Sequence, residues 1–161
     1  MAKLAEIGTP APDFTLPGLL LGSDGTVTRA DYTLSAAKGR PLVLAFYPGD
    51  QSKVCTAQLC SYQSELAEFT EMGAEVWGIS PQDLESHEKF ALKERLEFPL
   101  LADPGLVSAK AFGITAPVLG LRRAVFVIDA EGIIRWKHVA VVGATFQSAS
   151  VIREQIVALA A

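Results

Sequence analysis

The two cysteines are the residues of this chain with the most distinctive chemistry. Cys55 and Cys60 are the only cysteines among 161 residues, and both lie in the stretch FYPGDQSKVCTAQLC, residues 46–60. A deprotonated cysteine is a nucleophile and a metal ligand, and two cysteines can form a disulfide. The pair therefore raises three kinds of chemistry: redox catalysis, metal binding and structural cross-linking.

The residues before Cys55 favour a reactive thiolate at the start of a helix. The apolar run RPLVLAFYP, residues 40–48, is typical of a buried strand. A helix is expected next, and its first turn would lower the pKa of the Cys55 thiol because free N–H groups and the helix dipole favour an anion. Ser52 could donate a hydrogen bond to the thiolate or to a ligand. Pro48 could shape and shield one side of the pocket.

The spacing of the two cysteines argues against a permanent disulfide. Cys60 lies five residues after Cys55, which on a helix is a turn of about 140° and a rise of about 7.5 Å. The two Cα atoms would then be roughly 8 to 9 Å apart, beyond the limit of about 7 Å for a disulfide. The cysteines can therefore pair only after local unwinding of the helix.

Other readings of the two cysteines remain open at this point. A buried cysteine on its own is most often a small core residue. A zinc site would need further ligands, and the only histidines, His87 and His138, lie far away in the sequence and are expected to be ordinary surface or helix-face residues. A thioredoxin-type dithiol reductase would have the spacing Cys-x-x-Cys, which is narrower than the one found here.

Composition and charge limit the class of protein. Half of the residues are hydrophobic, and the formal net charge is −4, which suits one compact domain over residues 1–161. No basic stripe is visible, so nucleic acid is not expected as a partner. The apolar runs are too short to span a membrane, and the first residues do not resemble a secretory signal. A cytoplasmic location is therefore expected, where paired cysteines are mostly catalytic, redox-active or metal-binding.

The order of expected elements predicts an α/β protein with a central mixed β-sheet and helices on both faces. Two short strands flank a turn at residues 23–25. The later strands are expected within residues 40–48, 74–80 and 98–104 and as a hairpin within 122–141. Helices are expected from the cysteine region to Gly73, from a start at Ser80, Pro81 and Asp83, within 105–113, and within 148–159. A thioredoxin-like fold uses this order.

These residues also carry a family resemblance. The stretch YPGDQSKVCTAQLC resembles the peroxiredoxin signature Pro-x-x-x-Thr/Ser-x-x-Cys, with Pro48, Ser52 and Cys55 in the named positions. A second cysteine five residues later resembles the bacterioferritin comigratory, or Q-type, subgroup. The segments GTPAPDFTLP, VWGISPQDLESHEKFA, FPLLADP and RRAVFVIDAEGIIR resemble other parts of the family, so the likeness covers most of the chain. Arg123 best matches the family's arginine, because Arg122 would point to the opposite face of a strand.

The resemblance implies a thiol-dependent peroxidase for hydrogen peroxide and organic hydroperoxides. Cys55 would attack the peroxide and become a sulfenic acid, and Cys60 would resolve it as an intramolecular disulfide. Thioredoxin or a similar dithiol would restore both thiols. Arg123 would lower the pKa of the Cys55 thiol and polarise the peroxide, together with the Ser52 hydroxyl and the Cys55 N–H. No metal, haem or flavin cofactor is implied, and the subgroup points to a monomer.

Two residues depart from the family pattern. The family more often has threonine at the position of Ser52, and glutamate at the position of Gln58. Gln58 can still hydrogen-bond an arginine but cannot form an ion pair.

A redox sensor or chaperone could use the same cysteine switch without being an enzyme. A general dithiol–disulfide oxidoreductase is disfavoured by the cysteine spacing.

Overall fold

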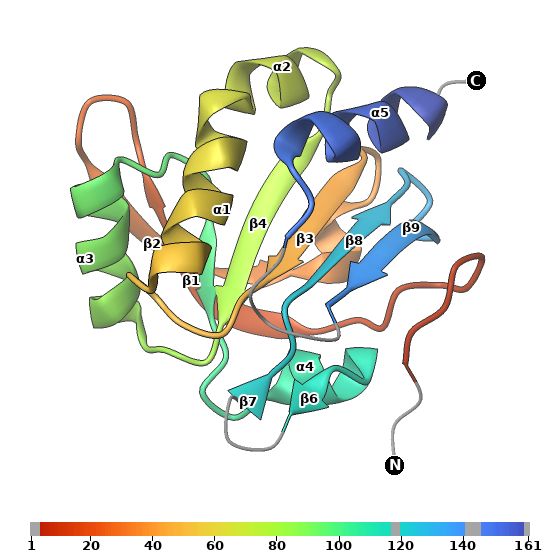
Figure 1. Ribbon diagram of the computed structural model, residues 1–161, viewed down its shortest axis with the longest axis horizontal. Coiled ribbons are helices and arrows are strands. Elements are labelled where there is room, and N and C mark those ends of the chain that lie inside the picture. Colours follow the sequence, from red (N-terminus) through yellow and green to blue (C-terminus); the bar gives the residue numbers. More distant parts are fainter. Residues whose placement is uncertain (1–3, 117–119, 141–145, 160–161) are drawn as a thin grey trace.

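A seven-stranded mixed sheet forms the centre of the molecule (Figure 1). The computed structural model describes residues 4–116, 120–140 and 146–159. The strand order is β2-β1-β5-β4-β3-β8-β9. The strands are β1 (Thr15–Leu21), β2 (Val27–Thr33), β3 (Leu42–Phe46), β4 (Glu75–Ser80), β5 (Leu100–Ala102), β8 (Ala124–Ile128) and β9 (Ile134–Val139). The three strands β3, β4 and β5 are parallel, while β1, β2, β8 and β9 join them through antiparallel pairs.

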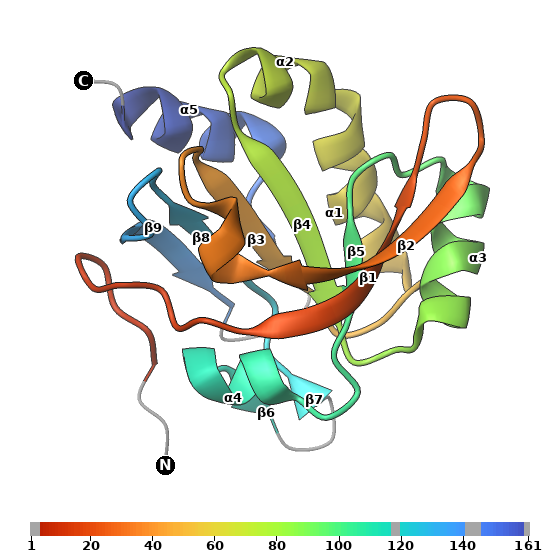
Figure 2. The same ribbon diagram turned by 180° about the vertical axis from the view of Figure 1, so that it is seen from behind.

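Helices cover both faces of this sheet, as the sequence predicts. One face is covered by α1 (Lys53–Ser64), α2 (Leu66–Glu71), α3 (Leu84–Glu94) and α5 (Ala149–Leu159) (Figure 1). The other face, seen in Figure 2, packs against α4 (Val107–Phe112) and the 3-10 helix η1 (Leu34–Ala37). A separate two-stranded sheet of β6 (Thr115–Ala116) and β7 (Gly120–Leu121) lies near α4 (Figure 1).

The central position of β3 explains why its sequence contains only apolar residues. Successive side chains of a strand point to opposite faces, and both faces are covered here. Val43 and Ala45 therefore belong to the core under α1 and α5. Leu42, Leu44 and Phe46 belong to the core on the α4 side. All five residues of β3 are buried, so this strand is a rigid support for the loop that follows it.

Two helix boundaries differ from the sequence-based expectation. The helix expected to run unbroken to Gly73 is divided at Glu65 into α1 and α2, although Gly73 does follow it with a positive φ of 75°. The predicted start of α3 at Ser80 was wrong. Asp83 is the N-cap, and its carboxylate accepts a hydrogen bond from the Ser86 N–H. Ser80 instead is the last residue of β4, where it pairs with Ala102 of the neighbouring strand β5.

The shifted start of α3 turns residues 81–82 into a connecting loop after β4. The loop after β3 comprises residues 47–52 and leads into α1. Because β3 and β4 are parallel neighbours, their two loops emerge at the same edge of the sheet, where sites in α/β folds are commonly built. Within the described parts of the chain, no helix is long and apolar enough to cross a membrane.

Candidate active site

Cys55 lies in the first turn of α1, as its sequence context predicts. Ser52 is the N-cap of this helix, and its hydroxyl accepts a hydrogen bond from the Cys55 N–H at 3.3 Å. The Cys55 side chain is fully buried, with 0% of its surface exposed. Ser52 therefore holds the backbone beneath the sulfur. The hydroxyl also has a proton of its own, which it can donate to a ligand.

Arg123 directs its guanidinium at the sulfur of Cys55. Its Nη2 donates to Cys55 Sγ at 3.1 Å, and its Nη1 donates to the side-chain oxygen of Gln58. Arg123 is only 4% exposed, so water screens its charge little. Arg122 points elsewhere, and its guanidinium donates to the carbonyl oxygen of Ala140 at 3.2 Å. The selection of Arg123 over Arg122 is thus consistent with the structure, although both residues lie just before β8 rather than within it.

Gln58 connects Arg123 to the rest of α1. It is fully buried, and its side-chain nitrogen donates to the Tyr62 hydroxyl one turn later at 2.9 Å. Burial raises the pKa of Tyr62 far above its ordinary value, so the phenol stays neutral. The amide of Gln58 is thus held between Arg123 and Tyr62, and it makes the hydrogen bond to an arginine that the sequence allows.

A buried histidine–aspartate contact lies beside the loop of residues 47–52. His87 of α3 and Asp50 approach to 2.6 Å, and their side chains are 0% and 2% exposed. The other ring nitrogen of His87 lies 2.9 Å from the carbonyl oxygen of Leu101. Both ring nitrogens thus lie within hydrogen-bond distance of an oxygen atom, so neither is left without a partner in the core. Tyr47 and Ser86 each donate a hydroxyl hydrogen bond of 2.6 Å to the same carboxylate.

Gln82 ties the loop after β3 to the loop after β4. Its side-chain oxygen accepts hydrogen bonds from the Asp50 N–H at 2.9 Å and from the Ser80 hydroxyl at 2.6 Å. Its side-chain nitrogen donates to the carbonyl oxygen of Pro48 at 3.2 Å. Pro48 is half-buried and is held through its carbonyl, so its ring has a fixed place near the start of α1.

The sequence predicts His87 to be a surface or helix-face residue, and the structure places it on the buried face of α3. Its side chain is fully buried and contacts Asp50. A signal was present in the sequence, because His87 lies three and four residues before Phe90 and Ala91, the other buried positions of α3. A histidine on that face needs polar partners, and Asp50 with its neighbours supplies them.

Cys60 has surroundings of a different kind. It lies in the same helix as Cys55, is partly buried, and has Glu94 of α3 as its neighbour, with 3.6 Å between Cys60 Sγ and Glu94 Oε2. Burial raises the pKa of the Cys60 thiol, and the charge and hydrogen bond of Glu94 raise it further. Both cysteines are free thiols, and the intact helix between them fits the expectation that they cannot bond without unwinding.

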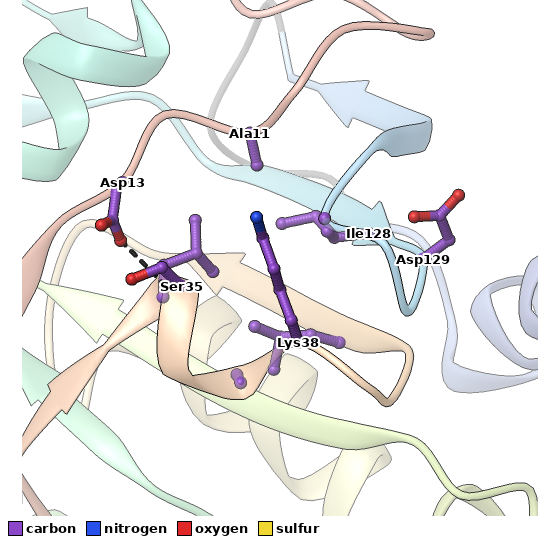
Figure 3. Close-up of a pocket in the computed structure, with 10 residues that line it drawn as sticks. Ala11, Asp13, Ser35, Lys38, Ile128 and Asp129 are labelled. Atoms are coloured by element: carbon purple, nitrogen blue, oxygen red, sulfur yellow. Dashed lines mark hydrogen bonds between the residues drawn. The ribbon is translucent and has the colours of Figure 1, made fainter.

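Two other features were tested as sites. Within the described residues, no group of three or more His, Cys, Asp or Glu side chains could hold a metal ion. A cavity of about 190 Å³ lies at the far end of β3 and β8, with Asp13, Ser35 and Lys38 among its lining residues (Figure 3). The Asp13 carboxylate there accepts a hydrogen bond from the Ser35 N–H and so serves the turn into η1. This cavity contains neither cysteine.

Comparison with known proteins shows the family. The family model described as AhpC/TSA matches residues 7–137. A peroxiredoxin named Bcp from Bacillus subtilis is 37% identical over 145 residues, which cover 84% of this chain and 87% of that protein. The chain belongs to the AhpC/TSA family of peroxiredoxins. A chloroplastic peroxiredoxin Q from Oryza sativa subsp. japonica is 38% identical over 131 residues, and the predicted likeness to the Q-type subgroup is thereby confirmed.

The extent of these matches differs between relatives. The match to the rice peroxiredoxin Q covers 80% of this chain but only 57% of the length of that protein. Among solved structures, AhpC from Enterococcus faecalis superposes with a TM-score of 0.82 at 25% identity, over 97% of this chain and 93% of that one. AhpC from Mycobacterium tuberculosis superposes with a TM-score of 0.89 at 21% identity, over 99% and 95%. The predicted thioredoxin-like fold is confirmed.

Proposed function

We propose that this peroxiredoxin is a thiol-dependent peroxidase that reduces hydrogen peroxide and organic hydroperoxides, with Cys55 as the reacting residue. The observation that carries the proposal is the 3.1 Å contact between the Arg123 guanidinium and the Cys55 sulfur at the start of α1. A cation and a helix N-terminus both stabilise a negatively charged sulfur. The family relationship supports the same activity.

In the first step, the Cys55 thiolate attacks one oxygen of the hydroperoxide. A sulfur–oxygen bond forms, the oxygen–oxygen bond breaks, and the departing hydroxide or alkoxide takes up a proton to leave as water or alcohol. Arg123 and the Ser52 hydroxyl can donate hydrogen bonds to the oxygen on which charge develops. The Cys55 N–H is engaged with Ser52, so it acts on the peroxide less directly than Arg123. Pro48 borders the site.

In the second step, the Cys60 thiol attacks the Cys55 sulfenic acid. A disulfide forms within the chain, and water leaves with the sulfenic oxygen and the thiol proton. Since both residues belong to α1, this helix has to open locally first. Thioredoxin or a similar dithiol then reduces the disulfide by exchange.

The remaining parts of the proposal concern the whole protein. We propose that residues 1–161 act as a single domain, that the protein works as a monomer, and that it needs no metal, haem or flavin. A cytoplasmic location remains a prediction from composition and cysteine use. The name of the rice relative says that it is chloroplastic.

Peroxide consumption coupled to thioredoxin turnover tests the proposal. The Cys55→Ser variant should lose activity completely, because the attacking thiolate is gone. Cys60→Ser should form the sulfenic acid once, detected by mass spectrometry after one equivalent of peroxide, but should not form the intramolecular disulfide. Activity of Cys55→Ser equal to that of the wild type would contradict the proposal. Slow peroxide consumption with an oxidised form that binds another protein would favour a redox sensor.

A further inference from the structure

Glu94, the last residue of α3, contacts the sulfur of Cys60. The distance between Cys60 Sγ and Glu94 Oε2 is 3.6 Å, which allows the thiol to donate a weak hydrogen bond to the carboxylate. The two side chains come from α1 and α3, which pack on the same face of the sheet (Figure 1). Both are partly buried, so water screens the contact less than on an open surface.

The contact matters because the peroxide pocket depends on a folded α1. Arg123 holds this helix at Cys55 and at Gln58. Unwinding of α1 would separate these groups from Arg123, and it would also carry Cys60 away from Glu94. A restraint on Cys60 therefore favours the conformation in which the pocket at Cys55 is complete.

We propose that Glu94 is a positioning residue that keeps Cys60 protonated and docked while α1 is folded, and that releases it when α1 unwinds. The inference rests on the proposed function, since it gives Cys60 the resolving role. A thiol is a much poorer nucleophile than a thiolate. Glu94 thus delays the second step until the first step has occurred and the helix has opened.

Release of Cys60 leaves the chemistry of resolution unchanged. Once Cys60 is away from Glu94, its sulfur forms a bond to the sulfur of the Cys55 sulfenic acid, and the sulfur–oxygen bond of that acid breaks. The sulfenic hydroxyl departs with the Cys60 thiol proton as water. The oxidant is the hydroperoxide of the first step, and no further reactant is needed.

The contact is first tested without peroxide, in a Cys55→Ser background where Cys60 is the only thiol. Adding Glu94→Gln should speed alkylation of Cys60 by iodoacetamide about threefold at neutral pH, as expected for the loss of one modest hydrogen bond and its charge. Glu94→Asp keeps the charge and should give an intermediate rate. Glu85→Gln removes an exposed charge from the other end of α3 and should change nothing. An unchanged or slower rate in Glu94→Gln would overturn the proposal.

The second test follows resolution with both cysteines present. After one equivalent of hydrogen peroxide, rapid quenching and mass spectrometry should show that Glu94→Gln forms the disulfide about threefold faster than the wild type. At excess peroxide it should accumulate less Cys55 sulfinic acid, because the sulfenic acid is shorter-lived. A slower disulfide in Glu94→Gln would make Glu94 a proton acceptor and overturn the proposal.

The two failures can be told apart. If the wild type forms the disulfide and Glu94→Gln forms it at the same rate, the role of Glu94 is wrong while the proposed peroxidase function stands. If the wild type forms no disulfide between Cys55 and Cys60 after peroxide, the resolving role fails, and the role given to Glu94 fails with it.

Discussion

The two ends of α1 place the same residue type in opposite electrostatic surroundings. At the first turn, the sulfur of Cys55 is fully buried and faces the Arg123 guanidinium. Five residues later, the sulfur of Cys60 is partly exposed and faces the Glu94 carboxylate. A cation stabilises a thiolate and an anion stabilises a thiol. One helix thus places one cysteine beside a cation and the other beside an anion.

The backbone around the two cysteines differs as well. The loop before Cys55 is fixed by the Asp50–His87 contact and by Gln82. Near Cys60, polar contacts instead join α1 to neighbouring helices, such as the Ser61 hydroxyl that accepts from the Ala149 N–H at 3.3 Å. The difference teaches that the partner charge and the neighbouring element together give two identical side chains different surroundings.

The largest expected effect comes from removing the cation beside Cys55. Arg123→Met should slow oxidation of Cys55 by hydrogen peroxide about 100-fold or more, because one donor to developing negative charge is typically worth that much. Alkylation of Cys60 should change far less, since burial and Glu94 raise the pKa of its thiol. Stopped-flow fluorescence measures the first rate and mass spectrometry the second.

Arg122→Met is the matched control for this experiment. Arg122 is adjacent in sequence but donates to the carbonyl oxygen of Ala140, so its loss should leave the oxidation rate of Cys55 near that of the wild type. Equal rates of Cys55 oxidation in Arg123→Met and Arg122→Met would contradict the role given to Arg123 at the first turn of α1.

The next largest effect concerns the support beneath the Cys55 loop. Asp50→Asn removes a buried carboxylate that contacts His87, Tyr47 and Ser86, which should lower the free energy of unfolding by about 3 kcal/mol. Urea denaturation of the reduced protein provides the measurement. The control is Asp83→Asn, an exposed N-cap at which asparagine serves as well as aspartate. Similar small losses of unfolding free energy in Asp50→Asn and Asp83→Asn would mean that the Asp50–His87 contact does not stabilise the loop before Cys55.

A smaller effect is expected at the helix cap. Ser52→Ala removes the acceptor for the Cys55 N–H and should lower the free energy of unfolding by about 1 kcal/mol. Ser64→Ala, at the opposite end of α1, removes an exposed hydroxyl that donates to the carbonyl oxygen of Ser61 and should cost much less. The same urea experiment compares them, and a larger loss in Ser64→Ala would reverse the inferred order of rigidity.

The smallest effect is a displacement of the pH profile of Cys60. Because its pKa is raised in the folded protein, the folded state binds a proton that the unfolded state has already lost. The resulting stability is present below the ordinary thiol pKa and is lost as the pH rises through the raised value. In the Cys55→Ser background, alkylation of native Cys60 should reach half its maximal rate at a higher pH than in urea. Identical midpoints would contradict the contrast between the two sulfurs.

The features that the sequence predicted are those set by local pattern. Each of three such features depends on residues that are neighbours in the sequence. They are the apolar run of β3, the spacing of Ser52 and Cys55 at the start of α1, and the choice of Arg123 over Arg122. The strand alternation decided between Arg122 and Arg123 because it inverts with every residue. These features were therefore accessible from a single chain.

The features that the sequence did not predict depend on distant segments. Asp50 and His87 lie 37 residues apart and meet only because α3 packs against the loop after β3. Glu94 and Cys60 lie 34 residues apart and meet for a similar reason. The start of α3 was misplaced because Ser80 and Asp83 are both good caps, and only the length of β4 decides between them.

The break at Glu65 limits how far melting of α1 can spread. Hydrogen bonds of α1 end at the Glu65 N–H, which donates to the carbonyl oxygen of Tyr62, while those of α2 begin at the Glu65 carbonyl oxygen. The two helices share no ladder, and α2 stays anchored by the fully buried Phe69. In the proposed cycle, local unwinding would therefore involve only the dozen residues of α1, and the packing of α2 on the sheet would remain in place.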